Sequence, residues 1–168
     1  MRKLTTGVML ILTVGAAGCA DTRVATPPQS STLERRDIEP GIRHQQECMA
    51  LAMYWEARGE GRRGMEAVGW TIRNRVHSPH FPSTPCEVVY EGGERPGCQF
   101  SWYCDGKSDR PRDRDSWQHA MLIAGDLLTR PGADPTGGAL FFHASGIRTP
   151  WHRNRPRAAQ IGGHVFYR

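Results

Sequence analysis

A glutamate at the end of an apolar run is the residue of this 168-residue chain whose surroundings most clearly suit it to catalysis. Glu56 follows the run C-M-A-L-A-M-Y-W at 48–55 and precedes A-R-G-E-G at 57–61. Because burial disfavours a charged carboxylate, a glutamate among aromatic side chains can keep its proton near neutral pH. Such a carboxyl group can act as a general acid. On the local pattern alone, the polar edge of an amphipathic helix is the simpler interpretation of Glu56.

Four cysteines form the second set of chemically distinctive residues: Cys48, Cys86, Cys98 and Cys104. An even number of cysteines in an exported domain indicates disulfides, and four cysteines allow three pairings that the sequence does not distinguish. The alternative is a zinc site built from Cys98, Cys104 and histidines. The chain has neither a CxxC nor an HExxH motif, so we predict no metal and no cofactor.

Residues 1–19 have the pattern of a secretory signal, with a basic start, a short apolar core and small residues at its end. The apolar core is shorter than the roughly 20 residues that a membrane-spanning helix needs. The segment A-A-G-C at 16–19 resembles a bacterial lipobox, which predicts lipidation of Cys19 and anchoring to a membrane. Cleavage after Ala20 by an ordinary signal peptidase is the alternative. We expect an exported protein of the cell envelope that faces the periplasm.

The formal net charge of +5 favours anionic partners. An export signal separates the chain from nucleic acid, so an anionic cell wall is the preferred partner. Residues 20–43 are rich in Pro, Ser and Thr and have no apolar periodicity, which is typical of a flexible linker. Residues 44–168 are then the single folded domain, and we expect a monomer.

Three helices are expected to position Glu56 and the residues around it. The first begins near His44 and carries the apolar run up to Glu56. The second, 63–77, has an apolar stripe at helical spacing. The third begins near Asp115 or Ser116 as its N-cap.

Short strands are predicted at 99–103, 139–143 and 163–167, and the element at 86–90 is left unassigned. The basic stretch 148–157 is expected to be a solvated loop. Helices followed by short strands favour a small α+β domain.

Six segments resemble, in order, motifs of the cell wall hydrolase family related to spore cortex-lytic enzymes. The first is the E-A-R-G-E signature that contains Glu56, and all six occupy residues 54–61, 67–76, 78–90, 99–106, 134–142 and 161–167. The resemblance implies a lysozyme-like α+β fold with a small antiparallel sheet. It also implies cleavage of peptidoglycan glycan strands between N-acetylmuramic acid and N-acetylglucosamine.

The family's catalytic glutamate corresponds to Glu56, and the family is described as acting like lytic transglycosylases. In that mechanism one glutamate protonates the glycosidic oxygen and then accepts the proton of the sugar's own 6-hydroxyl, which leaves a 1,6-anhydro end. A hydrolytic muramidase would more usually need a second carboxylate. Asp105 and Glu60 are the candidates, although Asp105 could simply be an Asp-Gly turn residue.

Other residues are expected to support the site or to contact sugars. Arg58, Glu60 and Asn74 are predicted to have structural roles. Glu60 is expected to cap or anchor the Gly-rich turn, with Arg58 or Arg62 as its partner. Sugar contacts are expected from Gln99, Phe100, Ser101, Trp102 and His143, although strand aromatics more often belong to the core.

Two other classes of function are compatible with the sequence: a non-catalytic wall-binding lipoprotein and a zinc-dependent wall amidase or peptidase. Unlike the spore enzymes, the chain has cysteines and an apparent lipobox and lacks visible wall-binding repeats. A preference for the modified cortex glycan is therefore not carried over to it.

Overall fold

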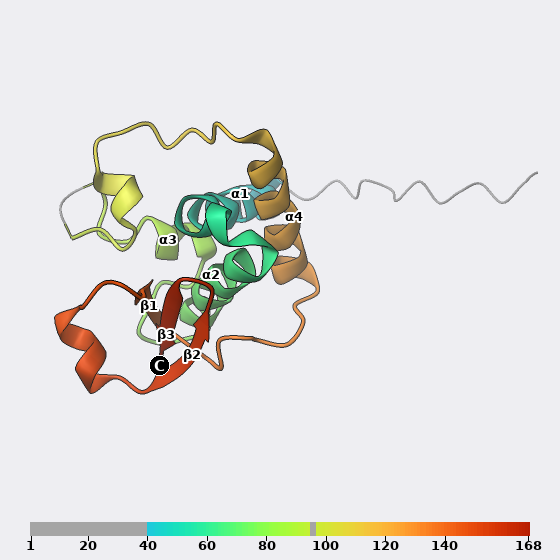
Figure 1. Ribbon diagram of the computed structural model, residues 1–168. Helices are drawn as coiled ribbons and strands as arrows, with labels where there is room; N and C mark the ends of the chain where they lie inside the picture. Colours follow the sequence, from blue (N-terminus) through green and yellow to red (C-terminus); the bar gives the residue numbers. More distant parts are fainter. Residues whose placement is uncertain (1–39, 95–96) are drawn as a thin grey trace, which may run out of the picture. The chain divides into compact units, whose positions relative to one another are not determined.

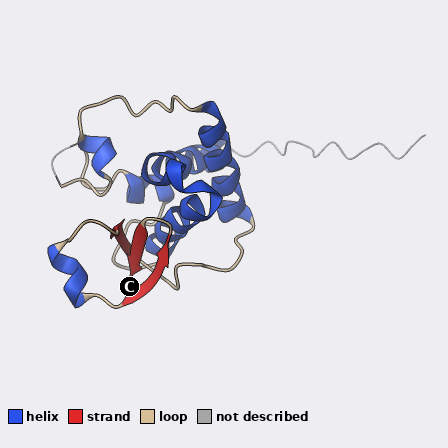
Figure 2. Cartoon of the chain, viewed as in Figure 1, coloured by secondary structure: helices blue, strands red, loops and turns tan. Residues whose placement is uncertain are grey.

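The computed structural model describes residues 40–94 and 97–168. The predicted signal, the lipidation of Cys19 and residues 20–39 of the predicted linker lie outside the described residues. Within the described part, no helix has the length and apolar character needed to cross a membrane. Among the residues that the structure describes, four α-helices precede a three-stranded sheet, which confirms the predicted α+β class. Figure 2 shows the helices and the sheet.

Helix α1 spans Pro40–Ala57 and is surrounded by the other helices (Figure 1). It begins four residues before the predicted start at His44, because a proline is tolerated in the first turn of a helix. Cys48, Met49 and Ala50 are all buried, and three consecutive residues of a helix point in different directions around its axis. A helix that is apolar on most sides belongs in a core rather than at a surface.

Helix α2, Gly61–Val76, lies between the helices and the sheet. The predicted apolar stripe is confirmed: Met65, Val68 and Ile72 are buried in the core that α2 shares with α1 and α4. Gly69 lies so close to Met53 and Leu127 that a side chain there would collide with both. On the opposite side, α2 contributes Ala67 to a second small core with the sheet.

Helices α3 and α4 complete the helical part. Helix α3, Pro85–Val89, resolves the segment that the sequence left unassigned, and the Thr84 hydroxyl caps its first turn. Helix α4 spans Arg114–Thr129, and its N-cap is Asp113 rather than Asp115 or Ser116. The Asp113 carboxylate accepts a hydrogen bond from the Ser116 N–H at 2.7 Å, as expected of an N-cap.

The sheet is antiparallel, with strand order β1-β3-β2. The strands are β1, Phe141–Ala144, β2, Arg157–Ile161, and β3, His164–Tyr167. Two of them were predicted, but β2 falls at the end of the stretch predicted as a basic loop. Its sequence R-A-A-Q-I has no aromatic residue and only one β-branched residue, Ile161, so it gives little local indication of a strand. Antiparallel pairing with β3, across the turn at Gly162 and Gly163, makes this segment a strand although its local pattern does not predict one.

The strand predicted at 99–103 is wrong: this segment forms the 3₁₀-helix η2, Ser101–Cys104. The Cys98–Cys104 disulfide explains the difference. An extended strand would hold these two Cα atoms about 20 Å apart, whereas the measured distance is 6.2 Å. The alternating aromatic residues that suggested a strand, Phe100 and Trp102, are both buried in the core, but they reach it from a turn.

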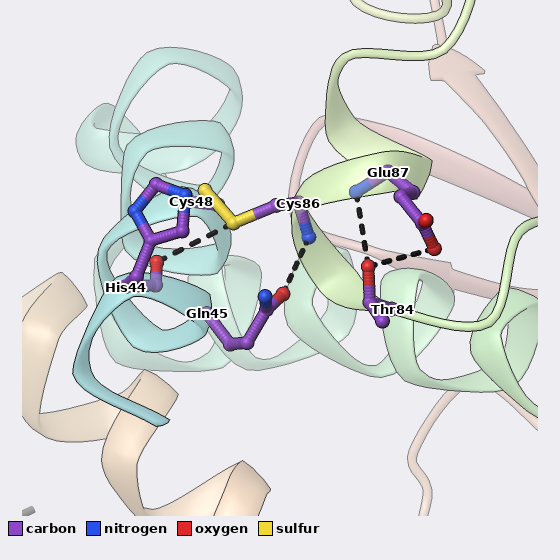
Figure 3. Close-up of a disulfide and its surroundings, with 6 residues drawn as sticks. All are labelled: His44, Gln45, Cys48, Thr84, Cys86 and Glu87. Carbon is purple, nitrogen blue, oxygen red and sulfur yellow. Dashed lines mark hydrogen bonds between the residues drawn. A yellow bond between two sulfur atoms is a disulfide. The ribbon is translucent and has the colours of Figure 1, made fainter. Parts of the chain in front are cut away.

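The second disulfide joins Cys48 of α1 to Cys86 of α3 (Figure 3). The Gln45 side chain accepts a hydrogen bond from the Cys86 N–H at 2.9 Å beside it. The prediction that all four cysteines form disulfides is confirmed. Zinc binds thiolates. Cys98 and Cys104, the cysteines of the zinc alternative, are bonded to each other and in this oxidised form are not available as zinc ligands.

Candidate active site

Glu56 occupies the last turn of α1, directly before the 3₁₀-helix η1, Arg58–Glu60. Its side chain is half-buried. Burial raises the pKa of the Glu56 carboxyl group to about 7, and the positive charge of Arg75 opposes part of that rise. The protonated and ionised forms are therefore both accessible near neutral pH, which is the condition that a group acting as acid and then as base requires.

Arg75 of α2 is the cation that acts on Glu56. It is buried, and its Nε donates a hydrogen bond to the Leu140 carbonyl oxygen at 2.7 Å. With the Gln99 side-chain amide oriented so that its oxygen faces Arg75, Gln99 Oε1 accepts hydrogen bonds from both Nη atoms of Arg75, each at 3.0 Å. Burial lowers the pKa of Arg75 to about 10, while Glu91 and Glu56 oppose the change. The guanidinium is thus held rigidly and remains charged at neutral pH.

One pocket, of about 450 Å³, is lined by residues of α1 that precede Glu56. The Tyr54 hydroxyl accepts hydrogen bonds from the N–H groups of Arg112 and Asp113, each at 3.0 Å. Trp55 Nε1 donates to the Asp109 carbonyl oxygen at 3.0 Å. These bonds tie the loop before α4 to the end of α1 and make it one wall of the pocket.

A second pocket, of about 330 Å³, lies where Arg75 meets the sheet. Its lining residues are Arg75, Gln99, Phe141, Phe142, Trp151 and Arg155. Arg155 was predicted to be solvated, but its Cζ atom lies 3.5 Å from the centre of the Phe141 ring. The prediction of a fully solvated loop at 148–157 is therefore wrong at Arg155, because neighbouring aromatic rings provide a surface for its guanidinium.

The turn after Glu56 is attached to the sheet. Glu60 Oε2 accepts a hydrogen bond from the Gly163 N–H at 2.8 Å, and Glu60 Oε1 lies 3.3 Å from His164 Nδ1 without hydrogen-bond alignment. Gly162 has a positive φ of 54°, and a side chain on it would collide with Glu60. Glu60 therefore connects the turn after Glu56 to the turn between β2 and β3.

The predicted partners of Glu60 differ from the observed ones. Arg58 lies over the rings of Tyr54 and Trp55, at 5.0 and 4.9 Å from their centres. Arg62 pairs with Glu66 at 2.7 Å. Both arginines are thus engaged elsewhere, and Glu60 is connected to the β2–β3 turn instead.

Replacing Glu60 with alanine is expected to lower the free energy of unfolding by about 1–2 kcal/mol, because a partly buried, charge-assisted hydrogen bond is lost. Denaturant unfolding of the full chain measures the change. The matched control is Glu47→Ala, since the exposed Glu47–Arg43 pair should contribute less than about 0.5 kcal/mol. Equal effects of the two substitutions would contradict the anchoring role.

Asn74 stabilises the loop that leads into β1, which contains Asp134 and Ala139. Its amide donates hydrogen bonds to Asp134 Oδ2 at 3.0 Å and to the Ala139 carbonyl oxygen at 3.1 Å. Asp134 in turn accepts from the N–H groups of Thr136 and Gly138, each at 2.8 Å. This network fits the structural role predicted for Asn74.

Asp105 lines the first pocket but is exposed and already paired. Its Oδ1 accepts from the Lys107 N–H at 2.8 Å, and its Oδ2 lies 3.2 Å from Lys107 Nζ. The hydrogen bond from the Lys107 backbone lowers the pKa of Asp105. Asp105 is therefore a carboxylate at neutral pH and not a proton donor.

The residues predicted to contact sugars do not form one cluster. Gln99 lines the second pocket, Trp102 lines the first, and Phe100 is buried in the core. Ser101 is exposed on η2. His143 Nε2 lies within hydrogen-bond distance, 3.1 Å, of the Tyr167 hydroxyl.

Sequence reasoning missed two features of the site, the Tyr54 hydroxyl and Arg155. Trp151 within an otherwise basic stretch was the available signal for Arg155.

The chain belongs to the cell wall hydrolase family, whose model matches residues 59–167. This match begins three residues after Glu56. The chain is 36% identical over 121 residues to a spore cortex-lytic enzyme of Halalkalibacterium halodurans, covering 71% of this chain and 33% of that protein. It is 33% identical over 119 residues to the spore cortex-lytic enzyme of Bacillus subtilis, covering 70% of this chain and 35% of that protein. The chain thus spans about a third of the length of these two relatives.

Two solved catalytic domains have a similar fold. The catalytic domain of the Bacillus cereus SleB protein gives a TM-score of 0.57 at 31% identity, covering 74% of this chain and 89% of that one. The catalytic domain of the germination-specific lytic transglycosylase SleB from Bacillus anthracis gives 0.58 at 33% identity, covering 74% and 93%. The predicted family and the lysozyme-like α+β fold are confirmed.

Proposed function

We propose that this protein cleaves the glycan strands of peptidoglycan, between N-acetylmuramic acid and N-acetylglucosamine, with Glu56 as the single general acid and base. The observation that carries the proposal is a half-buried glutamate at the end of α1, whose carboxyl pKa is raised by burial to about 7. Tyr54 and Trp55, which precede it, line the first pocket, and Arg75, which acts on it electrostatically, lines the second. Membership of the cell wall hydrolase family supports the choice of substrate.

The proposed reaction begins with Glu56 protonated. Its proton passes to the glycosidic oxygen, which leaves with N-acetylglucosamine as the bond to C1 of the muramoyl residue breaks. The 6-hydroxyl oxygen of the same muramoyl residue bonds to C1 and gives its proton to the Glu56 carboxylate. The product is a 1,6-anhydro end, no water is consumed, and Glu56 returns to its starting form.

The contacts of the two candidates for a second catalytic carboxylate, Glu60 and Asp105, favour this one-carboxylate mechanism over hydrolysis. Glu60 is committed to the Gly163 N–H, and Asp105 is committed to Lys107. A second carboxylate that activates water or attacks C1 would have to give up such contacts. The lytic transglycosylase named among the similar structures supports the same choice.

The pH dependence of cleavage tests the role of Glu56. Because Glu56 must carry its proton in the free enzyme and its pKa is raised to about 7, kcat/KM should be nearly constant below pH 7 and fall about tenfold per pH unit well above it. An ordinary glutamate would be only a few per cent protonated at pH 6. Initial rates on purified sacculi between pH 5 and pH 9 measure the profile. A rate that rises through pH 7 would contradict the proton-donor role.

We also propose that the protein acts in the cell envelope, tethered by lipid at Cys19 and a linker. The signal-like pattern of residues 1–19 and the two disulfides support an exported location. A non-catalytic wall-binding protein remains the alternative function. It has no need for a carboxyl group whose pKa is held near 7.

A further inference from the structure

Two arginine side chains border the second pocket. Arg75 is buried and Arg155 is half-buried, and both line the pocket together with Gln99 and three aromatic residues. Among the described residues, neither guanidinium has a carboxylate within the 4.0 Å of an ion pair. Two cations without a close anion in one pocket are costly, because desolvation disfavours charge.

Both guanidinium groups are held in place by contacts with uncharged groups, while Glu91 and Glu56 act on Arg75 electrostatically without pairing with it. The Leu140 carbonyl oxygen and the Gln99 amide orient Arg75. The Cζ atom of Arg155 lies over the Phe141 ring at 3.5 Å from its centre, and Trp151 packs against the same ring. Ordered guanidinium groups lose little freedom when they bind, and their planar N–H groups match the two oxygens of a carboxylate.

The position of Arg75 relates this pocket to the proposed reaction. Arg75 borders the pocket and also acts electrostatically on Glu56. An anion in the pocket would therefore lie beside the sugar whose bond Glu56 cleaves. The N-acetyl and hydroxyl groups of the glycan are neutral, so the charge must come from the substituent of the muramoyl residue.

We propose that the Arg75–Arg155 pocket binds a carboxylate carried on the lactyl substituent of the muramoyl residue next to the scissile bond. This inference rests on the proposed function and names a subsite of it. The carboxylate has two sources with the same chemistry: the lactyl group itself in a strand without stem peptides, or a carboxylate of an attached stem peptide. Trp151 and Phe141 provide the apolar wall against which the substituent lies.

Binding measured in a Glu56→Gln background tests the subsite separately from cleavage. The full chain is compared with and without Arg155→Gln, and the matched control is Arg153→Gln. Arg153 lies on the 3₁₀-helix η3, Pro150–Asn154, which ends directly before Arg155, and it is exposed and does not line this pocket. Three soluble glycan ligands are used: strands with stem peptides, strands stripped by an amidase, and stripped strands whose carboxylates are capped as methylamides.

Arg155→Gln should weaken binding of at least one carboxylate-bearing strand about tenfold, since hydrogen bonds to charged groups are lost. It should change binding of the capped strands less than twofold, and Arg153→Gln should change none of the three by more than that. A loss confined to stripped strands identifies the lactyl carboxylate, and a loss confined to peptide-bearing strands identifies the stem.

Equal loss with capped strands, or no loss with any strand, would overturn the subsite. Binding of the capped strands also reports that each variant is folded. If the protein with Glu56 intact cleaved no glycan strand but still bound strands in a way that depends on Arg155, the proposed function would be overturned and the subsite would stand.

Discussion

Replacing Glu56 with glutamine should reduce the release of soluble fragments from purified sacculi by at least about 100-fold, because a general acid–base contributes about that much or more. Glutamine has the size of the glutamate but carries no transferable proton. The measurement is the initial rate of fragment release by equal amounts of the two full-length proteins. The matched control is Glu47→Gln, because Glu47 is an exposed glutamate of the same helix that pairs with Arg43.

Loss of stability does not explain the expected loss of activity. The pKa of Glu56 is raised on folding, so its contribution to stability is fully present below the unfolded value near 4.5 and is lost as pH rises through about 7. Glutamine avoids this burial of charge, and the Glu56→Gln protein should melt at the same temperature as wild type or higher at pH 8. A variant that melts normally and still digests sacculi would contradict the assignment of Glu56.

Removing the Cys48–Cys86 disulfide by a double substitution to alanine should lower the free energy of unfolding by about 4 kcal/mol. The reason is that the bridge closes a loop with a sequence separation of 38, and cross-linking a loop of that length restricts the unfolded chain by about that amount. The bridge also joins α1, which carries Glu56, to α3 (Figure 3). Denaturant unfolding of the oxidised wild type and of the variant measures the difference.

The Cys98–Cys104 bridge is the internal control for this prediction. Its sequence separation is 6, so its removal should cost only about 2 kcal/mol on the same reasoning. If removal of the short bridge destabilised the protein more than removal of the long one, restriction of the unfolded chain would not account for the stability that these disulfides provide.

The parts of the fold that the sequence predicted are those with strong local patterns. The stripe of α2 defined both the helix and its buried face, since Met65, Val68 and Ile72 can share one side only in a helix. The predictions failed where distant residues decide the local structure. The disulfide turns 99–103 into a 3₁₀-helix, and pairing with β3 makes a strand of the alanine-rich β2.

The candidate site was also predicted only in part, where local sequence determines its features. The position of Glu56 after an apolar run follows from neighbours in the sequence. The partner through which Glu60 anchors the following turn, the Gly163 N–H, is 103 residues away and was not predicted. The cation that acts on Glu56 comes from α2, and the Tyr54 hydroxyl holds a loop 58 residues away. Arg155 was assigned to solvent because the aromatic ring that it covers, Phe141, lies in strand β1, outside the basic stretch. Such contacts depend on the tertiary fold, which a single sequence does not display.

The mass of the products released from purified peptidoglycan is the most direct test of the account. If Glu56 alone transfers the proton from the 6-hydroxyl, the full-length protein should release muropeptides with 1,6-anhydro ends, and Glu56→Gln should release none. Products heavier by one water would contradict the one-carboxylate mechanism, and release of stem peptides from uncut strands would contradict glycan cleavage itself.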